Sequence, residues 1–216
     1  LISRGSDRSP PGEPLPADVR KLLEQHLQSN AKALESLHGA AAIPEARYPV
    51  DLARGFNATM PHLAHLREAY RLLCWEAVLC ADRRDPNGAA QALEATVRVA
   101  GTVSREPAML SLMLQRVGAG WAAVVLERLL SRVELSDEQL MRLEGAFRAA
   151  GGQEGLLRAL TGERCASIAC LQKPHVMTRW HGDGLPFPAF LEAYHALGLA
   201  AREGAIYLDR MEECFR

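Results

Sequence analysis

The segment from 173 to 186 contains the side chains best suited to acid–base or metal chemistry. Its two histidines and its aspartate could bind a metal ion or transfer protons, and its glycines allow tight backbone geometry. The alternative is a plain surface loop that a tryptophan anchors to the fold, and we favour that interpretation. The segment is still the best candidate binding loop, because binding residues concentrate in loops. Its candidate residues are His175, Arg179, Trp180, His181 and Asp183.

Two pairs of oppositely charged residues form a second group of candidate site residues. Arg47 and Asp51 flank a Tyr-Pro-Val tripeptide, and Glu163 is followed directly by Arg164. We expect these charges to anchor the long irregular segment from 39 to 59 onto the helices. The alternative is a groove in which an arginine binds the carboxylate of a peptide, because guanidinium and carboxylate groups match in geometry.

A third group consists of His62, His65 and Glu68, which follow one another at intervals of three residues on a predicted helix. Metal sites use histidine and glutamate at such spacings, but no second helix offers a matching pair, so we expect a polar helix face. The chain also lacks the nucleophile-elbow, Walker, dinucleotide-binding and HExxH motifs. We therefore expect no metal, no cofactor and no catalytic residues, and we favour a non-enzymatic function.

Composition argues against two classes of partner. The chain has 216 residues and a formal net charge of −1, whereas nucleic-acid binders usually carry a strong basic excess. Aromatic residues make up only 6% of the chain, which leaves few platforms for base stacking. The most apolar run, 117–126, has about half of the ~20 residues that a membrane span needs. We therefore expect contact with neither nucleic acid nor a membrane by these residues.

Apolar spacing predicts an all-α fold of about seven helices. Their expected ranges are 16–37, 61–84, 86–104, 107–133, 137–150, 153–171 and 188–215. Asp85 and Ser136 mark two helix starts because each can cap the first turn, and Ser136 forms a capping box with Gln139. Short loops imply antiparallel hairpins, either in a right-handed tetratricopeptide-like superhelix or in an irregular bundle. Residues 1–15 are expected to be a flexible linker and residues 16–216 a single helical domain.

The predicted helix over 107–133 is apolar on nearly every side, so we expect it at the centre of the fold with Trp121 buried. The hairpin before it contains Gly-Ala-Ala-Gln-Ala-Leu (88–93), which is typical of a close helix crossing in a tetratricopeptide repeat. However, 17 residues separate Ala90 from Pro107, where that repeat expects about a dozen. The sequence therefore predicts a hairpin of this type without a regular repeat array.

Several segments together resemble an uncharacterised bacterial family of helical proteins. They are ARYPVDLARG (46–55), MPHLAHLREAYRLL (60–73), DPNGAAQALEATVRVAG (85–101), REPAMLSLMLQRV (105–117), LSDEQLMRLEGAF (135–147), LRALTGERC (157–165) and AIYLDRMEE (205–213). Members typically carry an R-[YF]-P-[VI]-D segment, a helix opening with PHL and a G-E-R-A segment. Cys165 stands where alanine is usual, and the loop HGDGLPFP (181–188) has no counterpart. The resemblance implies no activity, but it does imply a hydrophobic N-terminal segment and hence an extracytoplasmic, membrane-anchored domain.

These observations favour an interaction or scaffold domain whose partner is a protein or peptide. This hypothesis predicts a concave groove or an exposed apolar patch. The alternative is an enzyme or metal-binding protein that uses the histidines of the 173–186 loop. A further interpretation is a homodimer whose interface covers part of the apolar surface.

Overall fold

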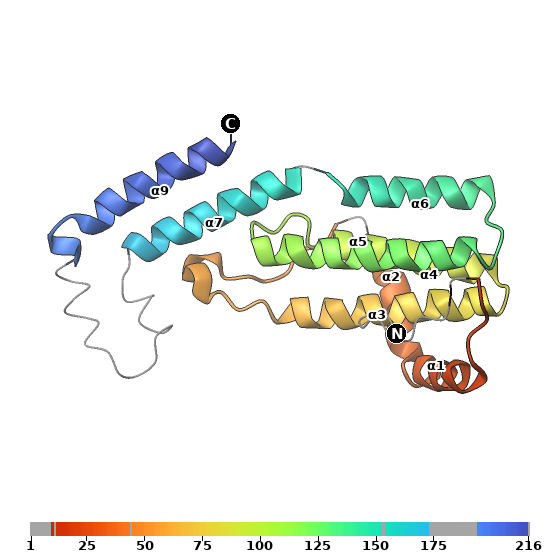
Figure 1. Ribbon diagram of the computed structural model, residues 1–216. Helices are drawn as coiled ribbons and strands as arrows, with labels where there is room; N and C mark the ends of the chain where they lie inside the picture. The colour runs from red at the N-terminus through yellow and green to blue at the C-terminus, as the bar shows by residue number, and fades with distance from the viewer. Residues whose placement is uncertain (1–9, 11, 44, 153, 173–193, 216) are drawn as a thin grey trace.

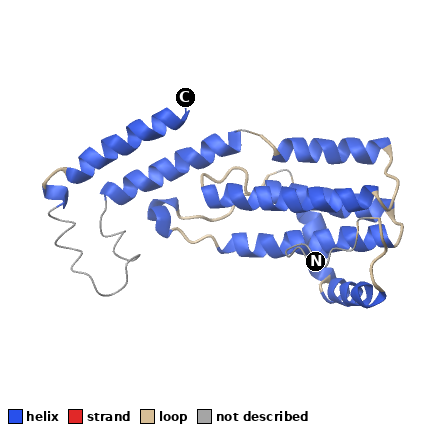
Figure 2. Cartoon of the chain, viewed as in Figure 1, coloured by secondary structure: helices blue, strands red, loops and turns tan. Residues whose placement is uncertain are grey.

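The protein is helical throughout the part of the chain that the structure, a computed structural model, describes (Figures 1 and 2). The described residues are all except 1–9, 11, 44, 153, 173–193 and 216. The helices are α1 (Ala17–Ser29), α2 (Ala31–Ala41), the 3-10 helix η1 (Leu52–Asn57), α3 (Pro61–Asp82), α4 (Pro86–Gly101), α5 (Met109–Leu130), α6 (Asp137–Ala150), α7 (Glu154–Gln172) and α9 (Leu199–Phe215). The predicted all-α class and its antiparallel hairpins are confirmed.

The single helix predicted over 16–37 is wrong, because the chain breaks at Asn30 into α1 and α2. Asn30 leaves the helical conformation with φ −110° and ψ 19°, and its side-chain amide donates to the carbonyl of His26 at 2.8 Å. Asparagine favours such breaks because its side chain can satisfy the backbone groups at a helix end. The turn lets Leu27 and Leu34, on either side of it, enter the same core cluster.

Helices α3 and α4 form the most buried part of the fold. Arg84 closes the turn between them with a positive φ of 62°, and the carboxylate of Asp85 then accepts from the N–H of Gly88 at 3.0 Å. Tyr70 and Leu73 of α3 and Leu93 of α4 are completely buried between the two helices and their neighbours. The helix start predicted at Asp85 is therefore confirmed.

Helix α5 is not the most buried helix, which corrects the prediction for 107–133. It buries one face against α3 and α4, while Trp121 is only partly buried, where two core clusters meet. An all-round apolar sequence cannot reveal how many sides a helix has covered. Among the described residues α5 is also the one helix long and apolar enough to cross a membrane, although 28% of its most apolar window is buried within the fold.

The capping box predicted at the start of α6 is confirmed. Ser136 accepts from the N–H of Gln139 at 3.3 Å, and the Gln139 side chain accepts from the N–H of Ser136 at 2.8 Å. The same glutamine donates to the Asn87 side chain at 2.8 Å, which fastens the start of α6 to the start of α4. Helix α6 thus packs mainly on α4.

The last helix begins later than predicted. Gly198, with a positive φ of 70°, interrupts the expected 188–215 helix, and α9 begins at Leu199. Residues 188–193 of that prediction lie outside the described part of the chain. Helices α7 and α9 form a hairpin that reaches away from the bundle (Figure 1), and α7 packs on α5 and on η1.

The end of the segment predicted as a linker is bound to the helical domain. Leu15 is buried, and its N–H donates to the carboxylate of Asp82 at 2.8 Å. That carboxylate, 1% exposed, also pairs with Arg20 at 2.6 Å and with Arg132 at 3.3 Å. A buried charge requires such partners, so Asp82 joins the N-terminal segment, α1, α3 and the end of α5.

Candidate functional site

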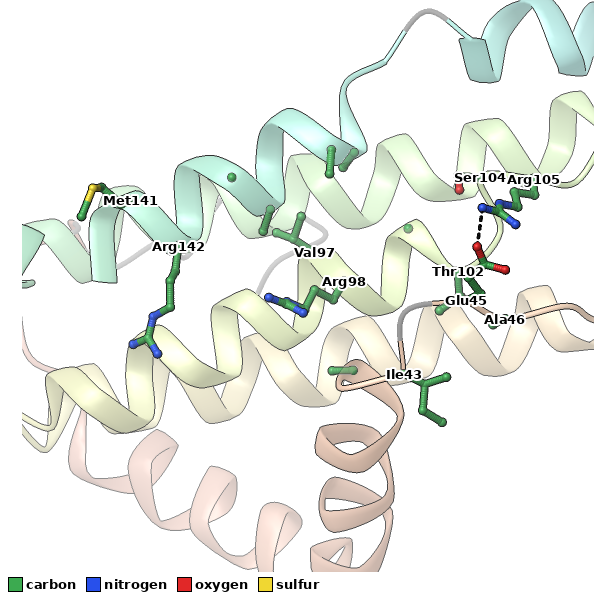
Figure 3. A pocket seen from close by; sticks show the side chains of 16 residues that line it. Ile43, Glu45, Ala46, Val97, Arg98, Thr102, Ser104, Arg105, Met141 and Arg142 are labelled. Carbon is green, nitrogen blue, oxygen red and sulfur yellow. Dashed lines mark hydrogen bonds and ion pairs between the residues drawn. The ribbon is translucent and has the colours of Figure 1, made fainter. Parts of the chain in front are cut away.

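A groove of about 590 Å³ lies between the C-terminal part of α4, the outer side of α6 and the segment that follows α2 (Figure 3). We call it the α4–α6 groove. Its lining residues are Ala41, Ile43, Glu45, Ala46, Val97, Arg98, Gly101, Thr102, Ser104, Arg105, Met141, Arg142, Gly145, Ala146, Ala149 and Ala150. Most of these side chains are small, so a ligand can approach the two helix backbones closely.

Three arginines are distributed along this groove, and Figure 3 shows them on separate elements. Arg98 pairs with Glu94 one turn before it at 2.8 Å, and Arg105 pairs with Glu45 across the groove wall at 2.7 Å. Arg142 makes no ion pair or hydrogen bond within the described part of the chain. Exposed ion pairs contribute little stability, so both paired arginines can exchange their partners for a ligand carboxylate at small cost.

A second groove, of about 720 Å³, adjoins the first. The two share Glu45, Ala46, Thr102 and Arg105 in their walls, and the second also contains Arg47. Arg47 is exposed and makes no ion pair with another described residue. Arginines therefore follow one another from Arg142 past Arg105 to Arg47, and the walls between them also contain Glu45 and Glu106.

A polar cluster of five residues holds the wall between this second groove and the core; its members are Tyr48, His62, Thr102, Glu106 and Ser111. The imidazole Nε2 of His62 lies 2.8 Å from Oε1 of Glu106, and Ser111 donates to the other oxygen of that carboxylate. The ring of Tyr48 stacks on His62 with 4.3 Å between centroids. Thr102 donates to the Val99 carbonyl, so the hydroxyl of Tyr48 donates to Thr102 at 2.9 Å. These contacts fix the segment after α2 against the start of α5.

This cluster is not arranged for nucleophilic catalysis. Ser111 is fully buried and bonds to the glutamate, whereas a catalytic base would be the histidine with the carboxylate behind it. Below the cluster, burial raises the pKa of the Tyr70 phenol well above its usual range, and the nearby Tyr48 and Glu106 add to this shift. Tyr70 therefore stays neutral at any physiological pH. The cluster acts as a support for the groove wall.

The candidate residues of the 173–186 loop, His175, Arg179, Trp180, His181 and Asp183, lie outside the described residues. Of the remaining candidates, Arg47 lines the second groove, and Asp51 is exposed and outside both groove walls.

Glu163 and Arg164 contact different parts of the fold. Glu163 caps the start of α5 by accepting from the N–H of Met109 at 2.8 Å, which ties α7 to α5. Arg164 lies 3.9 Å from Glu212 of α9, so its ion pair is within the α7–α9 hairpin. The expectation that Arg164 anchors the 39–59 segment is not supported by this pairing.

The three residues His62, His65 and Glu68 have three different surroundings. His62 turns inward to Glu106, whereas His65 is exposed and Glu68 pairs with Arg71 at 3.2 Å. Within the described ranges, no three histidine, cysteine or acidic side chains are grouped so that they could hold a metal ion. Glu106 had no signal in the sequence, because its partners come from helices that only the fold brings together.

Comparison of the chain with protein-family models, with curated proteins and with solved structures gives no match.

Proposed function

We propose that the protein is a non-enzymatic interaction domain that binds an acidic peptide segment along the α4–α6 groove. The observation that carries this proposal is the row of Arg98, Arg105 and Arg142 over a floor of glycine and alanine, with Arg142 unpaired within the described residues. Guanidinium groups bind carboxylates through two parallel hydrogen bonds, and they hold this charge at all relevant pH values.

The shape of the groove favours a peptide over a small metabolite. Gly101 and Gly145 have open space where a β-carbon would be, so the floor is free of side chains from two helices. The path continues into the second groove towards Arg47. An extended segment with acidic side chains at intervals could therefore contact all four arginines in turn, whereas a compact ligand would reach only one or two.

The arrangement of hairpins supports the same class of function. The consecutive hairpins α3–α4 and α5–α6 stack on each other, and the α4–α6 groove lies between their second helices. This is similar to the way in which tetratricopeptide-like helical repeats create extended binding surfaces. We propose that these hairpins form a tetratricopeptide-like superhelix.

The resemblance to a bacterial helical family fits this location of the site. Tyr48 and Glu106 line the second groove, and His62 supports both of them from behind. Each of the three comes from a segment on which that resemblance rests. We propose that the groove wall belongs to an architecture shared with that family. The domain would then sit outside the cytoplasm, held at a membrane by an N-terminal segment, and would present its groove to an extracytoplasmic partner.

Fluorescence polarisation with a labelled glutamate-rich peptide tests the proposal. The wild-type chain should bind this peptide. A control peptide in which every glutamate is replaced by glutamine should bind at least tenfold more weakly. The triple variant Arg98→Ala, Arg105→Ala, Arg142→Ala should lose binding. The matched control is Arg148→Ala, on the same helix as Arg142 but paired with Glu144 outside the groove.

Two results would overturn the proposal. One is equal binding of the glutamate and glutamine peptides, and the other is full binding by the triple variant. Circular dichroism of each variant shows whether the helices are intact, so that a loss of binding is assigned to the groove. An affinity capture from a bacterial extract, with wild type and triple variant side by side, would then identify the natural partner.

A further inference from the structure

The side of α5 that faces away from the bundle is apolar along about 21 Å, from Leu110 to Val124. We call it the α5 outer face. Figure 1 shows α5 in front of α4, and Figure 3, from the side of the groove, shows α4 in front of α5. The face is therefore on the opposite side of the bundle from the α4–α6 groove. Its large side chains are strongly exposed: Leu110 58%, Met113 59%, Val117 39% and Val124 43%.

Small residues occupy the middle of this face. Gly120 and Ala123 are exposed, and a β-carbon at Gly120 would meet no atom within 4 Å. At 3.6 residues per turn, Gly120 is directed away from the buried Ala122 and Leu129. Another helix could therefore come close to the backbone of α5 at this point.

Two opposite charges stand on one side of the centre of this face: at 3.6 residues per turn, Glu127 lies about 20° and Arg116 about 40° from the direction of Gly120. Arg116 and Glu127 are both exposed, and they are eleven positions apart, about 16 Å along the helix. They are too far apart to pair with each other. Glu127 has no ion pair with any described residue, and Arg116 reaches only the carbonyls of Gly151 and Gly152 at 3.5 Å, which leaves most of its donors free.

The pattern of the face is complementary to itself when it is reversed. Arg116 and Glu127 are equally distant from the midpoint between residues 121 and 122, and Gly120 and Ala123 flank the same midpoint. Val117 and Val124, on the other side of the centre, flank a midpoint one residue earlier. A twofold axis across the helix reverses its direction and keeps each side facing the same side of the copy. With the axis at the midpoint of the charges, each charge meets its opposite, and each valine lies about 3 Å along the helix from the partner's valine, which still allows contact.

We propose that the α5 outer face is the interface of a twofold symmetric dimer in which two copies of α5 pack antiparallel. Arg116 lies against the partner's Glu127, and the symmetry forms this ion pair twice. Gly120 lies against the partner's Ala123, where the two backbones approach most closely, and the valines pack on the other side of the centre.

A membrane surface fits this face less well than a second copy. Inserting the face into lipid would bring Arg116 and Glu127 towards the hydrocarbon region without partners, and unpaired charges there are costly. The dimer satisfies the same two charges. The proposal is independent of peptide binding, because the residues of the α5 outer face do not line the α4–α6 groove.

Charge exchange tests the pairing. Sedimentation velocity over a range of concentrations should show a dimer for the wild-type chain, and Arg116→Glu or Glu127→Arg alone should weaken dimerisation about tenfold or more, because each places like charges together. The double variant Arg116→Glu, Glu127→Arg should restore the dimer. The restoration is specific to an antiparallel pair, since a different protein partner or a lipid surface would bind the double variant no better than the single ones.

Cysteine cross-linking tests the register. Gly120→Cys should form a disulfide between two chains on mild oxidation, because residue 120 lies within two positions of the twofold axis. Cysteine at the exposed Ala149 of α6 is the control and should not cross-link. A monomer at every concentration up to the millimolar range would overturn the proposal, as would a dimer that both charge variants leave intact. Binding of the wild-type monomer to anionic vesicles, with loss on Val117→Asp, would assign the face to a membrane instead.

Discussion

Two glycines of α5, two residues apart, are expected to respond to the same substitution with opposite sign. Gly118 is buried where α5 crosses the α3–α4 hairpin, and an added β-carbon would lie 2.7 Å from the Ala100 side chain and 2.9 Å from the ring of Tyr70. Gly120 is exposed with open space beside it. The chain therefore provides its own matched control for the packing of α5.

The magnitudes follow from two opposing effects. Alanine stabilises a helix interior by roughly 0.5–1 kcal/mol relative to glycine. Gly120→Ala should show this gain alone. Gly118→Ala adds overpacking of about 1–3 kcal/mol, because Tyr70 is completely buried and its ring cannot move aside. Its net effect should be a loss of about 1–2 kcal/mol in the free energy of unfolding.

Urea denaturation followed by circular dichroism measures both changes, at a dilution where concentration no longer affects the transition. A smaller cost of Gly118→Ala in an Ala100→Gly background would identify the crowded contact. If Gly118→Ala proved as stable as Gly120→Ala, α5 would not cross α4 at Gly118 and the described packing would be wrong.

Two further substitutions or modifications test the core. Asp82→Ala removes the buried carboxylate that holds two arginines and a backbone N–H, so the free energy of unfolding should fall by about 3 kcal/mol or more, measured by the same urea titration; a loss below about 1 kcal/mol would show that this ion cluster is not buried. Burial raises the pKa of Cys74 to about 12 and that of Cys80 to about 11, so these thiols remain protonated at pH 8, whereas Cys165 is exposed. In a variant with Cys170 and Cys214 replaced by serine, a thiol reagent at pH 8 should label Cys165 rapidly. Cys74 and Cys80 should react only as the pH rises or the chain unfolds. Rapid labelling of Cys74 in the native protein would contradict its buried placement.

Local signals in the sequence were sufficient to predict where several helices begin. Asp85 and Ser136 cap their helices with hydrogen bonds to residues no more than three positions away, so their chemistry can be read from a few letters. The break at Asn30 was missed because the leucines on its two sides keep helical spacing across it. Whether a helix continues or turns there depends on the core that Leu27 and Leu34 enter, which is a property of the whole fold.

The candidate site was largely beyond prediction for the same reason. The arginines of the α4–α6 groove come from α4, the loop after it and α6, and each alone is typical of an exposed helix residue. Of the three arginines proposed from the sequence as binding residues, Arg179 lies outside the described residues, and of Arg47 and Arg164 only Arg47 lines either groove. The direction in which α5 exposes its apolar side was equally hidden, because a helix that is apolar on every side gives no indication of which side remains uncovered.

The two proposals together lead to a bivalent molecule. The α5 outer face and the α4–α6 groove lie on opposite sides of the bundle (Figures 1 and 3). A dimer formed through α5 would therefore leave both grooves open and direct them away from each other. Such a dimer would bind a surface that carries many copies of an acidic segment far more tightly than it binds one free peptide. Arg116→Glu should therefore weaken binding to peptide-coated beads while the affinity for the free peptide stays unchanged. Equal loss in both assays would mean that the dimer interface and the groove are not separate.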